Sequence, residues 1–355
     1  MVRSHRRRLG AALLATVLCG MLTVVDARTA TAVIPSADLS DLAIYIMSAP
    51  SDVMRIGPDG TVSFPGRNVG NLAQGMAAAP DGTLYAITPL DNKVWEIAPG
   101  EAPAVVPFST TVTAPQDVAV DDAGTLYAAS TGTNRIVKRA PDGTETSIPF
   151  SAGILAAMAV DHDGSHIYLF DLANSGEIVR MDADGGNRTV IAGWNDIQRI
   201  VAFTVDDQKR IYVGNSDGDL YRITPGSGSN TIDHLATNVG NITRLAVSDN
   251  GEVFVVRYNS TDMVRVHPDG TIEPIVSQLP APAGLLVRTV PAPPTTVTAT
   301  AGSGSADVEW NAGQTNGGRP IARYTAVSDP GGLTCTPAVP TDTHCTVTGL
   351  TAGVP

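Results

Sequence analysis

The chain of 355 residues contains 35 glycines and 25 prolines but only 5% aromatic residues, a composition typical of many short strands joined by tight turns. Its formal net charge of −12 excludes a strongly basic surface of the kind that binds nucleic-acid phosphates or anionic membranes. We therefore expect an all-β fold and no nucleic-acid partner.

Residues 1–32 have the pattern of a secretion signal peptide. Arginines up to Arg8 precede an apolar run from Leu9 to Val25, and Ala30-Thr31-Ala32 offers small residues for cleavage. The apolar run is 17 residues long, whereas a membrane-spanning helix needs about 20, so cleavage is favoured over an uncleaved anchor. The expected mature protein is secreted or associated with the cell envelope and has no membrane span. The paired arginines allow twin-arginine export as well as the general secretory route.

A segment with a period of 40 to 44 residues recurs through most of the chain. Its clearest copy, Ala114 to Arg139, has three short runs of alternating apolar residues separated by turns, the pattern of a β-meander. A further turn rich in Pro, Asp and Gly then sends each copy back as a fourth strand. Six copies align on the aromatic residue of the second strand: Tyr45, Tyr85, Tyr127, Tyr168, Tyr212 and Phe254.

The two ends of this array complement each other. The first copy begins at its second strand, whereas the last segment, Ala283 to Val287, supplies a first strand and then stops. Together they complete one blade, which closes a ring and removes exposed sheet edges. Four strands per period and six copies predict a six-bladed β-propeller over residues 33–290.

The copy at Val118 to Lys138 carries Val-Ala-Val-Asp, then Gly-x-Leu-Tyr, then Asn134-Arg135-Ile136. In these motifs the chain resembles the NHL-repeat and regucalcin/gluconolactonase-like six-bladed propellers. The resemblance implies that ligands bind where the innermost strands begin, over a central channel. It also implies a Glu with Asn and Asp partners for a lactonase metal site, or a channel His for streptogramin-lyase chemistry.

The residues that lead into the first strands are therefore the candidate ligand site. We take six of its polar members as the candidate ligand-binding residues: Gln74, Gln116, Asp117, Arg199, Asn241 and Arg244. Asp117 is the one carboxylate among them, and the histidines lie in turns or an outer strand, so we predict no catalytic residues, no metal site and no cofactor. These side chains either form an internal hydrogen-bonding ring around a water-filled channel or capture a polar or anionic ligand.

The C-terminal part reads as a separate small domain. Residues 291–296 form a Pro-rich linker. Residues 297–355, with Trp310 and Tyr324 at core positions, resemble a bacterial fibronectin type III domain, an immunoglobulin-like β-sandwich, that is incomplete after Leu350. Either the chain is a fragment, or the half-domain is completed by another chain. In an oxidising compartment we expect a Cys335–Cys345 disulfide.

These observations favour a secreted, non-catalytic propeller that acts as a binding or scaffold module, with the fibronectin-type domain as a spacer. Its partner would be an unknown extracellular protein or glycan, and the protein would be a monomer. The alternative is a secreted hydrolase or lyase, lactonase-like or associated with polysaccharide degradation, because fibronectin-type modules often accompany secreted carbohydrate-active enzymes.

Overall fold

The computed structural model describes residues 39, 41–48, 52–58, 60–70, 75–150, 155–172, 176–257, 262–277, 279, 282–313, 321, 323–329 and 331–351. The signal peptide predicted at residues 1–32 lies outside these residues. The described residues form β-strands and one 3₁₀ turn, Pro89–Asp91. Among them there is no helix long and apolar enough to cross a membrane.

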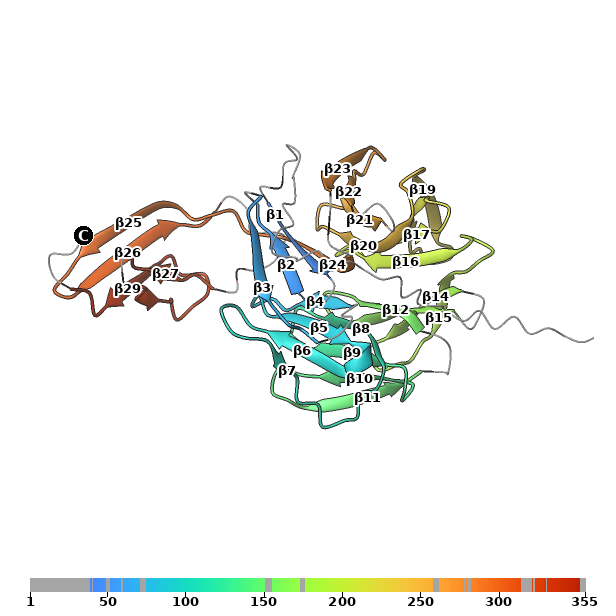
Figure 1. The fold of residues 1–355 in the computed structure, drawn as a ribbon, viewed down its shortest axis with the longest axis horizontal. Coiled ribbons are helices and arrows are strands. Elements are labelled where there is room, and N and C mark those ends of the chain that lie inside the picture. Colours follow the sequence, from blue (N-terminus) through green and yellow to red (C-terminus); the bar gives the residue numbers. More distant parts are fainter. Residues whose placement is uncertain are drawn as a thin grey trace, which may run out of the picture.

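Six four-stranded antiparallel sheets surround a common centre (Figure 1). Each innermost strand contacts the innermost strands of its neighbours, so the six sheets are the blades of a ring. We number the blades by the chain order of their innermost strands and give the strands of each from the inside outward. Blade 1 is β4 (Met76–Ala78), β5 (Leu84–Thr88), β6 (Lys93–Ile97) and β7 (Ala104–Val105); blade 2 is β8 (Pro115–Val120), β9 (Leu126–Ser130), β10 (Arg135–Arg139) and β11 (Glu145–Pro149); blade 3 is β12 (Leu155–Val160), β13 (His166–Asp171), β14 (Glu177–Asp182) and β15 (Thr189–Ala192).

The other three blades follow the same order. Blade 4 is β16 (Ile200–Val205), β17 (Ile211–Asn215), β18 (Leu220–Thr224) and β19 (Thr231–Ala236); blade 5 is β20 (Ile242–Val247), β21 (Val253–Arg257), β22 (Met263–Val266) and β23 (Ile272–Val276); blade 6 is β24 (Pro282–Thr289), β1 (Leu42–Ser48), β2 (Asp52–Ile56) and β3 (Val62–Gly66). The predicted six-bladed propeller is therefore confirmed.

Blade 6 contains both ends of the array. β24 pairs antiparallel with β1, and Leu286 stands opposite Tyr45 in that ladder. The expected completion of one blade by head and tail is thus confirmed. Because each innermost strand now has a neighbour on both sides, the ring has no open end at which a strand could slip or pair with another chain.

The hydrophobic core consists of six clusters, each lying between two neighbouring blades. Between blades 2 and 3, for example, Tyr127 and Ile136 belong to the same cluster as Met158 and Ile167. The aromatic residue of every second strand faces the next blade in this way, so its recurrence with the repeat reflects packing between blades. Each blade is consequently stabilised by both of its neighbours.

Two of these aromatic residues also fix the first hairpin of their blade. The hydroxyl of Tyr127 donates to Asp121 at 3.0 Å, and the hydroxyl of Tyr212 donates to Asp206 at 3.2 Å. Each carboxylate also accepts a backbone N–H of its own turn, from Thr125 in one blade and from Arg210 in the other. Burial and the Asp206 charge raise the pKa of Tyr212 to about 12, so its hydroxyl stays protonated and continues to donate.

A smaller all-β unit follows the propeller and projects to one side of it in Figure 1. β25 (Thr295–Ala301), β26 (Ser305–Asn311) and β29 (His344–Thr348) form one sheet, and β27 (Ala326–Val327) pairs with β28 (Thr334–Cys335). β25 begins inside the segment expected to be a linker.

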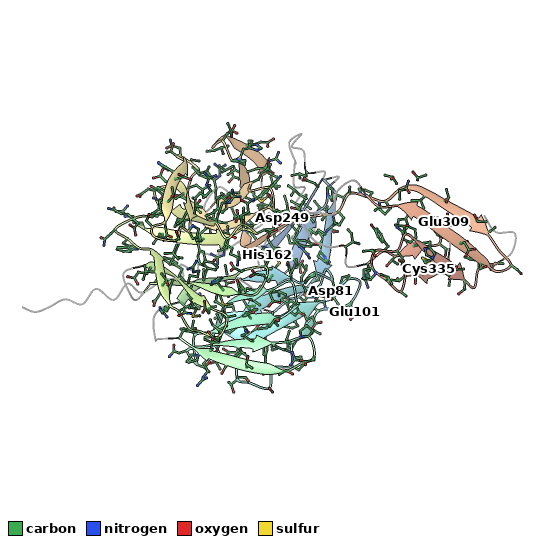
Figure 2. All side chains as sticks on the ribbon, turned by 180° about the vertical axis from the view of Figure 1, so that it is seen from behind. Asp81, Glu101, His162, Asp249, Glu309 and Cys335 are labelled. Carbon is green, nitrogen blue, oxygen red and sulfur yellow. A yellow bond between two sulfur atoms is a disulfide. The ribbon has the colours of Figure 1, made fainter. Side chains whose placement is uncertain are left out.

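The Cys335–Cys345 disulfide is present as predicted, and Cys335 is labelled in Figure 2. Buried Trp310 contacts Tyr324, with ring centroids 5.4 Å apart. The identity of this C-terminal unit as a fibronectin type III domain stays a prediction.

The closing blade provides a test of how the ring is stabilised. Ile44 of β1 is fully buried in the cluster between blades 5 and 6. Ile44→Ala should lower the free energy of unfolding by about 3 kcal/mol, because it leaves a cavity between two blades. Val62→Ala, in exposed β3 of the same blade, is the matched control. Equal urea midpoints for the two variants would contradict the assignment of the core to the blade interfaces.

Candidate functional site

The innermost strands of the six blades line a central cavity of about 230 Å³. All six strands start at one end of this cavity, which we call the channel mouth, and finish at the other, which we call the far end. The wall between the two ends is made mostly of small and aliphatic side chains, among them Ala77, Ala119, Ala159, Ala246 and Leu286. The few polar side chains in the lining are therefore the candidates for contacts with a polar ligand.

In each innermost strand, one residue pairs with the aromatic residue of the second strand. The residue two positions before it lies at the channel mouth, and the six residues at this position form a ring. A β-bulge precedes this position in β8, β12, β16, β20 and β24. The extra residue bends the strand and directs the next side chain toward the channel. This mouth ring consists of Gly75, Asp117, Ala157, Ala202, Arg244 and Gly284.

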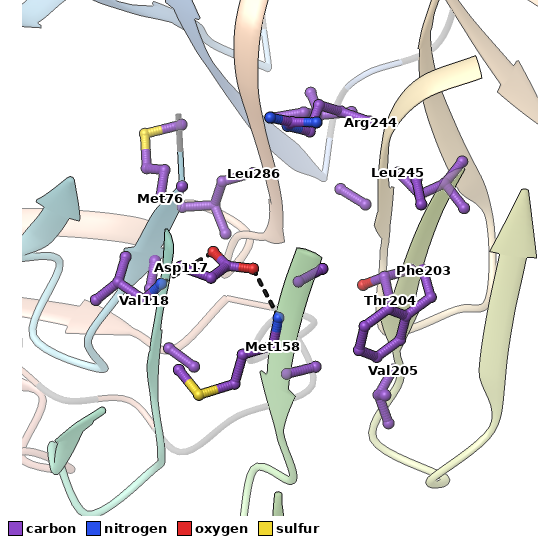
Figure 3. Close-up of a pocket in the computed structure, with 18 of the residues that line it drawn as sticks. Met76, Asp117, Val118, Met158, Phe203, Thr204, Val205, Arg244, Leu245 and Leu286 are labelled. Carbon is purple, nitrogen blue, oxygen red and sulfur yellow. Dashed lines mark hydrogen bonds between the residues drawn. The ribbon is translucent and has the colours of Figure 1, made fainter. Parts of the chain in front are cut away.

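Two members of the mouth ring carry a charge, and they have opposite signs. Asp117 belongs to blade 2 and Arg244 to blade 5, three blades apart, so they face each other across the cavity (Figure 3). The ring positions between them are Ala or Gly. The mouth is thus a gap with an anion on one wall and a cation on the other.

Asp117 is held in place by two backbone amides. Its Oδ2 accepts the N–H of Met158 in blade 3 at 2.9 Å, and its Oδ1 accepts the N–H of Val118 at 2.9 Å. A Cβ atom on Gly75 would overlap this carboxylate, so only a glycine leaves room for it. Burial raises the pKa of Asp117 to about 6, although the two hydrogen bonds and the charge of Arg244 oppose the rise.

Arg244 is half-buried and faces the gap. Its Nη1 donates to the carbonyl oxygen of Thr243 at 3.0 Å, and among the described residues it forms no salt bridge with a carboxylate. Burial lowers the pKa of the guanidinium, and the charge of Asp117 opposes this shift. The two side chains therefore interact electrostatically without touching. An oxygen of a ligand in the gap could accept hydrogen bonds from Arg244.

The other predicted site residues lie in different places. Gln116 lines the cavity beside Asp117. Arg199 does not line it; a positive φ of 55° and a 3.0 Å ion pair with exposed Asp217 direct its side chain to the solvent. Asn241 is exposed and also lies outside the cavity lining. Gln74 lies outside the described residues.

One cavity residue, His162, was not expected. It follows β12 and lines the far end of the channel, and Figure 2 labels it near the middle of the ring. Its Nε2 lies 2.5 Å from Asp207 of blade 4, and its Nδ1 lies 3.6 Å from Asp122 of blade 2. The sequence predicts this histidine beside a hairpin turn. Each such turn follows an innermost strand, so it lies at the far end of the channel. His162 thus links three blades there.

In the part of the chain that the structure describes, no group of three or more His, Cys, Asp or Glu could hold a metal ion. Comparison with known families and with curated proteins yields no match to this chain. Solved structures do resemble it. A catalytically inactive virginiamycin B lyase from Staphylococcus aureus, with quinupristin, matches with a TM-score of 0.51 at 14% identity over 79% of this chain and 95% of the lyase.

A gluconolactonase from Xanthomonas campestris matches equally well, with a TM-score of 0.51 at 14% identity, over 79% of this chain and 94% of the lactonase. TolB from Acinetobacter baumannii gives a TM-score of 0.55 at 13% identity, over 72% and 68% of the two chains. At these identities the similarities establish the propeller fold.

The close approach of Gly75 to Asp117 gives a testable prediction. Gly75→Ala should destabilise the protein by about 1 to 3 kcal/mol, because the new methyl group displaces the carboxylate from the Met158 amide. Gly228→Ala is the matched control, since a Cβ atom there meets nothing within 4 Å. Thermal unfolding of both variants measures the effect. If Gly75→Ala were as stable as the control, the carboxylate would not be held as described.

Proposed function

We propose that the protein is a hydrolase or lyase that acts at the channel mouth on a small ester or lactone. The observation that carries this proposal is the facing pair of Asp117 and Arg244, which points a carboxylate and a guanidinium into one gap. A lactonase and a lyase share this propeller fold at 14% identity, which supports the proposal.

In this proposal Arg244 holds the oxygen on which negative charge develops. A guanidinium presents several N–H donors in one plane, and the small side chains around the mouth leave its free donors directed at the gap. In lactone hydrolysis the bound oxygen would be the carbonyl oxygen of the scissile ester. In an elimination it would be the carbonyl oxygen next to the carbon that loses a proton.

Asp117 would act as the base. A carboxyl group with a pKa of about 6 is mostly ionised at neutral pH and is more basic than an ordinary aspartate. It could take a proton from an attacking water in hydrolysis, or from the carbon next to the carbonyl in elimination. The two backbone amides that hold it keep its oxygens on the wall of the gap.

The pH dependence of turnover tests these roles. We expect kcat on glucono-lactone, γ-lactones or a cyclic depsipeptide to rise with pH through about 6, because Asp117 accepts a proton only when ionised. Asp117→Asn should lower kcat by about a hundredfold or more. Arg244→Met should raise KM and move the rise to higher pH, since it removes the charge that lowers the pKa of Asp117.

Arg199→Met is the matched control for these variants, because this arginine is exposed and lies outside the cavity. It should leave kcat and KM unchanged. Turnover that is equally unaffected by Asp117→Asn and Arg244→Met would disprove the assignment of the reaction to the channel mouth. The assays should be run with and without a chelator, so that a contribution from added metal is measured directly.

A second candidate function is a non-catalytic binding or scaffold module. One observation favours it: both carboxylate oxygens of Asp117 already accept backbone N–H groups, and one of these bonds joins blade 2 to blade 3. In that case Asp117 is a structural link and Arg244 alone binds an anion. Ligand binding without turnover, retained in Asp117→Asn, would select this candidate.

The location belongs to the same proposal. The predicted signal peptide at residues 1–32 and the disulfide in the C-terminal unit support an oxidising, extracytoplasmic compartment. The C-terminal unit would serve there as a fibronectin-type spacer. The mass of the protein in the culture medium, before and after reduction, reports both cleavage and the disulfide.

A further inference from the structure

Between the two charged walls, the described residues that line one side of the channel mouth are apolar. Blades 3 and 4 contribute Ala156, Ala157, Val201 and Ala202 to the cavity lining there. Val201 keeps 38% of its surface exposed even though it lines the cavity. A ligand held between Asp117 and Arg244 therefore has an apolar surface beside it on this side.

Two further exposed apolar side chains stand on the mouth face of blade 3. Because the innermost strands start at the mouth, the loop after each second strand and the connection after each fourth strand also lie on that face. In blade 3 the first of these loops carries Leu172, which is 41% exposed, and the connection from β15 to β16 carries Trp194, which is 50% exposed. The two side chains belong to adjacent segments, because the Trp194 ring lies against Gly176 of the loop that carries Leu172.

Trp194 is held in a defined position by the neighbouring loop. Its indole ring lies directly against the backbone of Gly176, where any Cβ atom would collide with the ring. Gly176 has a φ of +71°, a conformation that other residues rarely adopt. The ring is thus packed on one side and open to solvent for half of its surface, the arrangement of a stacking platform.

We propose that the ligand of the channel mouth is amphipathic. Its polar group lies between Asp117 and Arg244, and a hydrophobic arm, alkyl or aromatic, crosses Val201 to rest on Trp194 and Leu172. The inference builds on the proposed function for the polar group. The preferred substrates are then lactones or esters with a long alkyl or aromatic substituent, rather than unsubstituted or sugar lactones.

The first experiment measures substrate preference. For the wild-type protein, kcat/KM should be higher for a γ-lactone with a hexyl substituent than for γ-butyrolactone. Trp194→Ala should lower this ratio about tenfold, as expected from the loss of half an indole of apolar contact, with γ-butyrolactone itself little affected. Trp194→Phe should retain most of the preference. Leu90→Ala is the control, because this leucine is 67% exposed on the same face but in blade 1.

The second experiment measures binding without turnover, with anilinonaphthalene sulfonate as the probe. This dye combines an anionic group with fused aromatic rings, so it should bind with its sulfonate at Arg244 and its rings on Trp194. Trp194→Ala and Arg244→Met should each weaken its binding about tenfold, and Leu90→Ala should not.

The two experiments separate the two proposals. If no lactone or ester is turned over but the dye responds to both variants, the proposed reaction fails and the amphipathic site stands. If Trp194→Ala behaves like Leu90→Ala toward the dye and the lactone series, the hydrophobic arm is disproved. Loss of dye binding in Trp194→Ala, with none in Arg244→Met, would also overturn the inference, since the rim would then bind independently of the mouth.

Discussion

The antiparallel pairing of β24 with β1 is the interaction on which the rest of the structure depends. It joins the two ends of the repeat array in one blade, and the ring it closes buries an apolar cluster at each blade interface. Closure also brings the starts of six innermost strands around one small cavity. Side chains that are separated by more than a hundred residues then become neighbours, and a site can form from single residues of different blades.

The chemistry available to such a site depends on which residue types stand at the six positions of the mouth ring. Repetition would place the same residue in every blade, yet the mouth ring has one acid, one base and four small residues. Since Asp117 and Arg244 stand three blades apart, neither neutralises the other by contact, and both lose hydration. Charges left in this condition are a feature of functional sites more often than of scaffolds. The apolar side of blades 3 and 4 adds a direction along which a ligand can extend.

The propeller and the positions at its channel mouth could be predicted from the sequence, because equivalent residues recur at a regular spacing in every blade. The spacing of Tyr45 to Phe254 defined the blades, and the missing first strand of the first copy indicated how the ring closes. The same spacing predicted Asp117 and Arg244 at the channel mouth, and both line the cavity. Arg199 was identified by the same rule and lies elsewhere, because a positive φ and its ion pair with Asp217 turn it outward. The direction of such a side chain depends on bulges and local backbone conformation, which the spacing of the repeats does not predict. The contacts of His162 with two other blades form only when the ring is closed.

The titration of Asp117 tests the central claim most directly, because the site depends on a desolvated carboxylate facing a guanidinium that forms no salt bridge among the described residues. Carbon-detected NMR of the aspartate carboxyl groups, assigned with Asp117→Asn, gives this pKa in the intact protein. The account predicts a pKa of about 6 in the wild-type protein and a higher one in Arg244→Met. A pKa near the ordinary 3.8, unchanged in Arg244→Met, would show that the two charges are hydrated and independent, and would contradict the account.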